Sequence, residues 1–275
     1  MMKTILLTIL SALFLSGIIG CQQVKVIKCA HTPKEFKDTV LNDNYNIIVM
    51  GHFIENDTTF FLKEFDKEDG KEYLNANIFI EPDKNSISYK KISQPIFDPE
   101  NDMNQLDGWN SYRLEQQMPP LHKIDLLDLP TDWIPLHLYQ NQYYIFDPCE
   151  VDMPFRRFLT DSTYAYYGME YYFSGIQKLE KKSESLYHIE LENKIQDSPT
   201  EPSQIYIHII DVQKKVAIWE YREKDKSKYE LMIPIESAKD FDMIICDCPR
   251  HKFFNESVFK FDEIDFETLF KQQKL

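Results

Sequence analysis

The chain has 275 residues, of which 31 are Lys or Arg and 45 are Asp or Glu, so its formal net charge is −14. A surface of that sign repels phosphate backbones, and this argues against nucleic acid as a partner. Only five of the seven glycines lie beyond Cys21, which leaves no room for G-x-G-x-x-G or a P-loop, so a nucleotide-binding fold is not expected.

The first residues have the order of a secretory signal. Lys3 is the only charge before Cys21, the run from Ile5 to Ile19 is apolar or small, and Gly20 stands directly before the cysteine. A membrane-spanning helix is disfavoured because a bilayer core needs about 20 apolar residues and no positively charged stop follows at once. The segment therefore predicts export.

Residues 18–21, Ile-Ile-Gly-Cys, resemble the lipobox of bacterial lipoproteins. The resemblance implies that residues 1–20 are a cleaved signal peptide, that the Cys21 thiol carries a diacylglyceryl group, and that the new amino terminus is acylated. Several acyl chains would hold a soluble domain at a bilayer, because one chain alone gives only marginal residence. Gln22 stands where Asp would favour inner-membrane retention in some bacteria, so the resemblance favours an outer membrane. The alternative is an ordinary signal peptide whose Cys21 pairs with another cysteine.

Residues 21–31 are expected to form a lipidated tether, and residues 32–275 a single β-rich domain. This domain is predicted to start with a helix in "TPKEFKDTVLN", where Thr32 would be the N-cap and Pro33 the first helical residue. From Asn46 the hydrophobic period changes to two. Short polar turns separate four segments that predict antiparallel strands, "NIIVMG", "TTFFLKEF", "EYLNANIFI" and "SISYKKI".

The stretch at about 94–132 breaks this pattern. It holds five prolines and no sustained period, so it is predicted to be a long irregular loop with room for one short helix. Loops of this length are uncommon unless they bind something or link domains. We expect the loop to pack across one domain, and the alternative is a domain boundary within it.

Alternation returns after the loop. Strands are predicted in "YYIF", "RRFLT", "TYAYY", "YYFSGIQKL", "LYHIELE", "IYIHII", "VAIWEY", "YELMIPI" and "DMIICDC". In "LYHIELE", Tyr187, Ile189 and Leu191 would face the core while the alternate residues form a wet face. Toward the end of the chain, "DFETLFKQQ" predicts a short helix.

These elements predict a mainly β fold. Roughly a dozen strands joined by short turns indicate an antiparallel meander, closed as a barrel or folded as a sandwich, with short N- and C-terminal helices. The aromatic content of 14% agrees with this, because aromatic side chains favour strands. The barrel variant would be similar to the calycins in general shape only.

Four cysteines lie beyond Cys21 and can oxidise outside the cytoplasm. We predict a disulfide between Cys149 and either Cys246 or Cys248, with buried thiols as the alternative. The stretch "CDCPRH" also places His251 close to two of these cysteines. Zinc sites more often space their cysteines C-x₂₋₄-C and need a fourth ligand, so no metal site is predicted.

One stretch, "TYAYYGMEYYF", concentrates tyrosines that are candidate ligand-binding residues: Tyr164, Tyr166, Tyr167, Tyr171 and Tyr172. If they line a barrel mouth, their rings could stack on sugars or on an apolar ligand while the hydroxyls orient it. The alternative is cross-strand aromatic packing.

Catalytic motifs are missing from the sequence. Neither G-x-S-x-G nor H-E-x-x-H occurs, so no catalytic residue, no enzyme activity and no cofactor is predicted. His137, His188 and His208 fall at outward or alternate strand positions, where surface imidazoles are the ordinary interpretation. The sequence favours a lipid-anchored, non-catalytic binding module for a small apolar or glycan ligand. The alternative is a structural or interaction subunit of a cell-envelope protein assembly.

Overall fold

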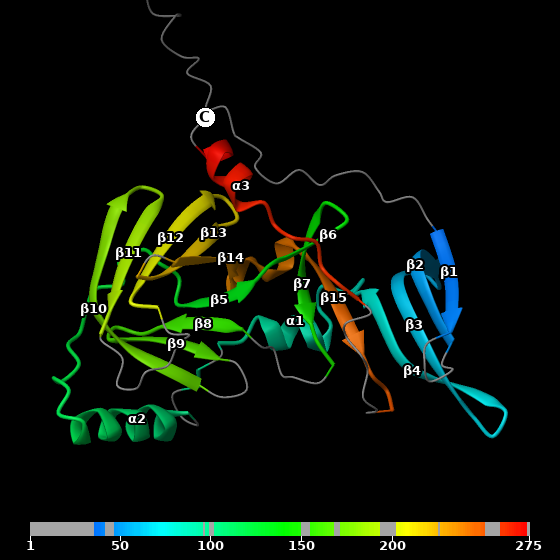
Figure 1. The fold of residues 1–275 in the computed structure, drawn as a ribbon, viewed down its shortest axis with the longest axis horizontal. Coiled ribbons are helices and arrows are strands. Elements are labelled where there is room, and N and C mark those ends of the chain that lie inside the picture. The colour runs from blue at the N-terminus through cyan, green and yellow to red at the C-terminus, as the bar shows by residue number, and fades with distance from the viewer. Residues whose placement is uncertain are drawn as a thin grey trace, which may run out of the picture.

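The fold comes from a computed structural model that describes residues 36–41, 47–95, 97–98, 102–149, 155–167, 171–192, 202–224, 226–250 and 259–273. Figure 1 shows two β structures side by side, a barrel and a curled sheet. The predicted signal peptide, Cys21 and the tether lie outside the described residues.

The N-terminal part of the described chain is a run of strands followed by two helices: β1 (Phe36–Leu41), β2 (Ile47–Glu55), β3 (Thr58–Glu68), β4 (Lys71–Ile80), α1 (Ile87–Ile92) and α2 (Met103–Glu115). The remainder is mainly strands: β5 (Asp132–Pro135), β6 (His137–Tyr139), β7 (Gln142–Asp147), β8 (Arg156–Leu159), β9 (Thr163–Tyr167), β10 (Tyr171–Ser183), β11 (Leu186–Leu191), β12 (Gln204–Asp211), β13 (Val216–Glu223), β14 (Lys226–Pro234), η1 (Ile235–Asp240), β15 (Asp242–Asp247) and α3 (Phe266–Gln273). The predicted mainly β fold is confirmed, and so is the C-terminal helix.

Eight strands form a closed barrel in the order β10-β11-β12-β13-β14-β5-β8-β9. All neighbours in it are antiparallel. Closure depends on β5, which precedes the other barrel strands in sequence: Ile134 lies opposite Ile233 of β14, and Asp132 lies opposite Phe158 of β8. Of the two predicted arrangements, barrel and sandwich, the structure therefore contains the barrel.

The barrel interior is filled by side chains. Trp133 and Trp219 come from β5 and β13, both are completely buried, and their ring centroids lie 5.4 Å apart. The other buried residues of this cluster come from β8 to β14 and the loop before β5: Leu129, Leu159, Tyr164, Ile176, Tyr187, Ile189, Leu191, Ile205, Ile207, Ala217, Tyr221 and Met232. An eight-stranded barrel is only just wide enough for such packing. Its middle is a hydrophobic core.

The other β structure is a seven-stranded sheet in the order β1-β2-β3-β4-β15-β7-β6. Its strands are antiparallel except for β15 and β7, where Met243 lies opposite Ile145 in a parallel pair. Sheet and barrel share one hydrophobic cluster, because Ile145 and Met243 pack with Ile218 and Leu231 on the outer face of the barrel. Helix α1 adds Tyr89 to the same cluster.

Two predicted elements are wrong. The predicted N-terminal helix is strand β1, which pairs with β2 from Phe36 opposite His52 to Leu41 opposite Ile47. Pairing satisfies backbone groups along β2 that a helix would leave exposed at the sheet edge. The predicted strand "SISYKKI" is helix α1, capped by Ser86, whose hydroxyl accepts a hydrogen bond from the Tyr89 amide at 3.3 Å. Tyr89 and Ile92 are both buried, and residues three apart share a face only in a helix.

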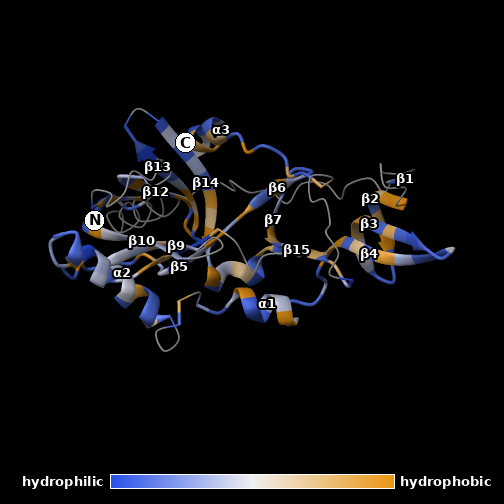
Figure 2. Ribbon diagram, turned by 60° about the horizontal axis from the view of Figure 1, so that its bottom comes forward, coloured by the Kyte–Doolittle hydropathy of each residue, from blue (hydrophilic) through white to orange (hydrophobic). Residues whose placement is uncertain are grey.

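The stretch at 94–132 contains the 13-residue helix α2, which lies beside the barrel (Figure 1). Its one buried residue is Arg113, and the helix is largely hydrophilic in colour in Figure 2. The Arg113 side chain donates from Nε to Glu192 Oε1 at 2.8 Å, and the Gly175 amide donates to the same oxygen at 3.0 Å. A Cβ at position 175 would lie 2.6 Å from the Glu192 carboxyl carbon, so only glycine leaves room for this attachment.

Candidate functional site

One end of the barrel is closed by the loop that follows α2. Leu126 and Leu129 of this loop pack against the barrel core. Its Asp128 accepts a hydrogen bond of 2.6 Å from the Tyr187 hydroxyl and an ion pair of 3.0 Å from Lys181. The end of the barrel near the turns after β8 and β10 is therefore covered by the chain itself.

The opposite end carries exposed aromatic rings. Tyr166 of β9 lies between Phe155 and Tyr172, with ring centroids 6.2 and 5.7 Å away and interplanar angles of 24° and 26°. Phe155 is 49% exposed and Tyr172 is 44% exposed. We call these three residues the aromatic row. The connections at this end, residues 150–154, 168–170, 193–201 and 225, lie outside the described residues.

The ion pair of Arg157, which is buried, and Glu230, which is half-buried, lies beneath the aromatic row. Arg157 of β8 donates to Glu230 Oε2 at 2.6 Å and to the Tyr221 hydroxyl at 3.1 Å, and Tyr221 donates to the same Glu230 oxygen at 3.0 Å. The Arg157 guanidinium carbon lies 4.1 Å from the Tyr166 ring centroid, which is a cation–π contact. Lys228 pairs with the other Glu230 oxygen at 2.8 Å.

Charge keeps this ion pair in its ionised form. Burial alone would raise the pKa of the Glu230 carboxyl, but the charges of Arg157 and Lys228 hold that pKa below its usual range. Beside the pair, burial raises the pKa of the Tyr164 hydroxyl to about 12, so the hydroxyl stays protonated. Two cations face one carboxylate, so this group of side chains carries one excess positive charge at neutral pH.

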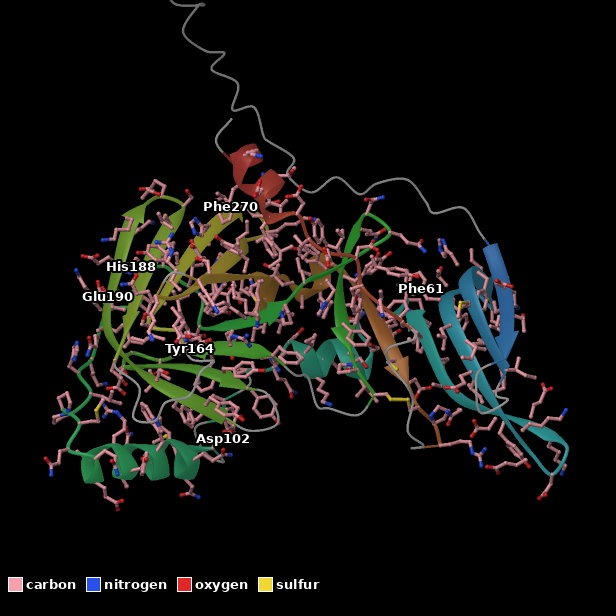
Figure 3. All side chains as sticks on the ribbon, viewed as in Figure 1. Phe61, Asp102, Tyr164, His188, Glu190 and Phe270 are labelled. Atoms are coloured by element: carbon pink, nitrogen blue, oxygen red, sulfur yellow. A yellow bond between two sulfur atoms is a disulfide. The ribbon has the colours of Figure 1, made fainter. Side chains whose placement is uncertain are left out.

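The five predicted tyrosines separate onto two faces, because neighbouring residues of a strand point to opposite sides. Tyr166 and Tyr172 belong to the aromatic row, and they are opposite each other in the β9–β10 register. Tyr164 lies deeper, inside the barrel, with its ring 6.3 Å from that of Trp219 (Figure 3). Only these three of the five therefore lie at or inside this end of the barrel.

Tyr167 and Tyr171 lie on the outer face of the barrel, and their rings are 4.8 Å apart. The Tyr171 hydroxyl donates to Asp102 at 3.1 Å, beside the start of α2, and its ring packs with Phe158 and Phe173. Tyr167 and Tyr171 therefore do not lie with the other three at the end of the barrel. They make the cross-strand aromatic packing that the sequence left open as the alternative, and Tyr171 also contacts the start of α2.

Sequence reasoning missed Arg157, Glu230 and Phe155. Arg157 and Glu230 are adjacent in space but are separated by 73 residues in the chain. Glu230 does alternate with Met232 along β14, a strand that was recognised, and Met232 is buried in the barrel core. That alternation is the one local signal that could have placed Glu230 on the inward face.

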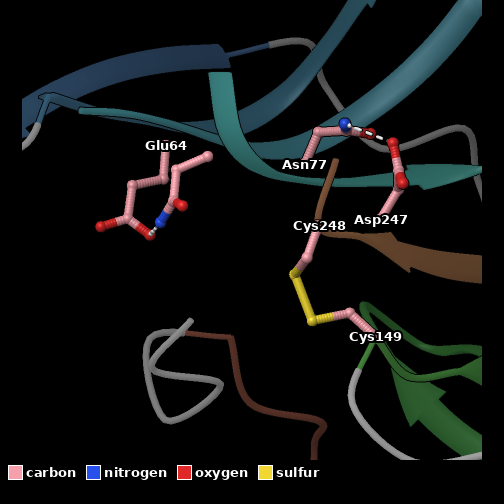
Figure 4. The surroundings of a disulfide bond; sticks show 6 residues. Glu64, Asn77, Cys149, Asp247 and Cys248 are labelled. Carbon is pink, nitrogen blue, oxygen red and sulfur yellow. Dashed lines mark hydrogen bonds between the residues drawn. A yellow bond between two sulfur atoms is a disulfide. The ribbon is translucent and has the colours of Figure 1, made fainter. Parts of the chain in front are cut away.

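The cysteines lie in the other β structure. The disulfide joins Cys149 and Cys248, whose Cα atoms are 5.7 Å apart (Figure 4), and Cys246 keeps its thiol and is buried. This is one of the two pairings that the sequence left open. His251 lies outside the described residues.

The sequence predicted surface imidazoles at His137, His188 and His208. The structure contradicts this prediction at His188 and His137. His188 is only 5% exposed, and its ring stacks on Tyr206 with centroids 4.4 Å apart. Glu192 on the same face is buried as well, so the predicted wet face of β11 is wrong at both residues. Burial also lowers the pKa of His137 to about 4, so that ring is neutral at pH 7.

Comparisons of the chain with models of protein families, with curated proteins and with solved structures find no match. Within the described part of the chain, no helix has the length and apolar character needed to cross a bilayer.

Proposed function

We propose that the chain is an extracytoplasmic, non-catalytic binding module that takes a glycan at the aromatic row. The observation that carries this proposal is the exposure of Phe155 and Tyr172 on either side of Tyr166, above the partly buried pair of Arg157 and Glu230. Exposed flat rings with a few fixed polar groups beside them are typical of sites that bind sugar rings.

The packing of the barrel favours a glycan over a small apolar ligand. An apolar ligand needs a hollow, whereas Trp133 and Trp219 fill the middle of this barrel. A sugar needs only one exposed ring face and hydrogen-bonding groups beside it. The tyrosine hydroxyls of the aromatic row and the ammonium group of Lys228, which is largely exposed, are such groups.

The test is a glycan-array screen of the purified protein, followed by affinity measurements on the strongest hit. Tyr172→Ala should weaken that binding about tenfold, which corresponds to about 1.4 kcal/mol for one lost stacking contact. Tyr73→Ala is the matched control, because Tyr73 is 40% exposed but lies in the sheet. Equal affinities of the two variants would show that the aromatic row does not bind the glycan.

We also propose that Cys21 carries the lipid anchor that the lipobox resemblance implies, with an outer membrane as the expected location. Replacing this thiol removes the acceptor of the diacylglyceryl group, so Cys21→Ser should move the protein from the membrane fraction to the soluble fraction. Unchanged fractionation would contradict the anchor and would leave the glycan proposal untouched.

A second candidate function is an interaction subunit of an envelope assembly. It is favoured by the same packed barrel, because a filled core leaves Phe155 and Tyr172 as exposed apolar surface of the kind that binds proteins. Under this alternative, Tyr172→Ala would disrupt co-purification of an envelope protein while the array shows no glycan hit.

A further inference from the structure

Three sulfur atoms gather at one end of the β7–β15 pair. These two strands are parallel, with Asp147 opposite Ile245, so the residues that follow them emerge side by side. Cys149 follows β7, Cys246 is the second-last residue of β15, and Cys248 follows β15 directly. The three Sγ atoms all lie within 4.8 Å of one another.

The strand geometry directs two of these sulfurs to one side. Cys246 and Cys248 are two residues apart and both belong to the same buried cluster, as expected for alternate positions on a strand. Asp247 between them takes the other side, where it accepts a hydrogen bond of 3.1 Å from Asn77 (Figure 4). A disulfide needs only two sulfurs, and the third thiol is already in place beside it.

We propose that reduction of the Cys149–Cys248 disulfide converts this cluster into a three-thiolate site for Zn²⁺. Zinc binds thiolate at about 2.3 Å, which places three coordinating sulfurs about 4 Å from one another. The observed separations need only a small adjustment to reach this, once the covalent bond between two of the sulfurs is gone. Soft thiolate ligands favour zinc over calcium or magnesium.

The chemistry balances with a dithiol as the co-reactant. The dithiol passes two electrons and two protons to the Cys149–Cys248 disulfide, becomes a disulfide itself, and leaves two protein thiols. Zn²⁺ then binds three sulfurs and displaces three thiol protons. The disulfide and the metal therefore exclude each other, and either one links the end of β7 to the end of β15.

The negative charge of three thiolates favours a divalent ion over a monovalent one at the sulfur cluster. Cys246 and Cys248 are buried beside Ile244 and Tyr144, where uncompensated thiolates are costly. Three thiolates around Zn²⁺ leave one net negative charge, whereas Cu⁺ would leave two. Water is the fourth ligand in this arrangement, as in zinc sites with three protein ligands.

The experiment is a titration of the reduced protein with Cd²⁺, an optical stand-in for Zn²⁺, with Cys21 and Cys29 replaced by serine to remove other thiols. We call the protein with these two replacements the reference protein. When reduced, it should bind one Cd²⁺ per chain with sulfur-to-metal charge-transfer absorbance, and Zn²⁺ should displace the Cd²⁺. The oxidised protein should show no such absorbance. Cys246→Ser is the matched variant, because it keeps the disulfide pair and loses one sulfur.

Reduced Cys246→Ser should bind Cd²⁺ at least tenfold more weakly than the reduced reference protein. Equal affinities, or no binding by the reduced reference protein, would overturn the proposal. If reduction unfolds the chain, Zn²⁺ should restore the circular dichroism spectrum of the reference protein and not that of Cys246→Ser. Failure to restore it would overturn the proposal equally, and neither result bears on glycan binding.

Discussion

The two ends of the barrel are formed by the same eight strands, yet one is covered by the loop at 124–131 and the other presents exposed aromatic rings. At the covered end, Asp128 takes hydrogen bonds from Tyr187 and Lys181 in solvent-exposed surroundings. At the other end, the ion pair of Arg157 and Glu230 is largely buried beneath the rings. Charged side chains therefore hold the covering loop at one end, and at the other end they lie beneath the exposed rings.

The largest expected effect concerns the core between the two ends. Trp219→Ala should lower the free energy of unfolding by about 3–5 kcal/mol, because it leaves a cavity beside Trp133 in the middle of the barrel. Urea denaturation measures this effect. Val212→Ala, at a site that is 76% exposed, should change the same quantity by less than about 0.5 kcal/mol. A loss below about 1 kcal/mol for Trp219→Ala would indicate a loosely filled barrel.

The next-largest effect is the difference in stability loss between removing the partly buried ion pair at one end of the barrel and removing the exposed ion pair at the other. Glu230→Gln leaves the buried guanidinium of Arg157 without a counter-charge and should cost about 2 kcal/mol. Asp128→Asn removes an exposed charge at the covered end and should cost about 0.5 kcal/mol or less. Denaturant midpoints of both variants test the difference, and equal losses would remove the distinction between the ends.

The contribution of the Arg157–Glu230 pair to the free energy of unfolding should fall in acid. The folded-state pKa of Glu230 lies below its unfolded value, so the stabilisation is fully present above the ordinary Glu pKa of about 4.3 and is lost as pH falls through the lowered folded value. The difference in unfolding free energy between the original protein and Glu230→Gln should therefore stay constant from pH 7 to about 5 and then shrink. A difference that grows on acidification would show that the carboxyl is protonated in the fold.

The smallest expected effect on stability is at the aromatic row. Tyr172 is about half exposed, so Tyr172→Ala should change the free energy of unfolding by about 1 kcal/mol or less. A ligand site on the rim should thus lose affinity without losing stability. Thermal denaturation of Tyr172→Ala beside Trp219→Ala checks this contrast, and similar losses for both would place Tyr172 in the core.

Alternating hydrophobic residues were sufficient to predict nearly all of the strands and the mainly β class. The errors occurred where a local pattern competed with distant contacts: the capping signals at Thr32 and Pro33 indicated a helix, but Phe36–Leu41 pairs along the edge of β2. In "SISYKKI" the alternation of Ile87 and Tyr89 hid the helical spacing of Tyr89 and Ile92. Helix α2 contacts the barrel through only two apolar residues, Leu106 and Trp109, and its one buried residue is Arg113. This face is too narrow and too polar for hydrophobic periodicity to reveal the helix.

The candidate site was predictable only in part. Strand alternation separates Tyr166 from Tyr167 and Tyr172 from Tyr171, but it cannot say that Tyr166 and Tyr172 share a face or which residues on distant strands lie beneath them. Arg157 and Glu230 meet because β5 closes the barrel between β14 and β8. No local feature of the sequence specifies that closure.

The most direct test of the central claim is proton NMR of a bound glycan selected by the array screen. A sugar face stacked on Phe155 or Tyr172 lies in the shielding region of the ring, so its ring protons should shift upfield on binding. The shifts should disappear with Phe155→Ala plus Tyr172→Ala and persist with Tyr73→Ala. A glycan that binds without upfield shifts, or whose shifts survive the double substitution, would contradict recognition by the aromatic row.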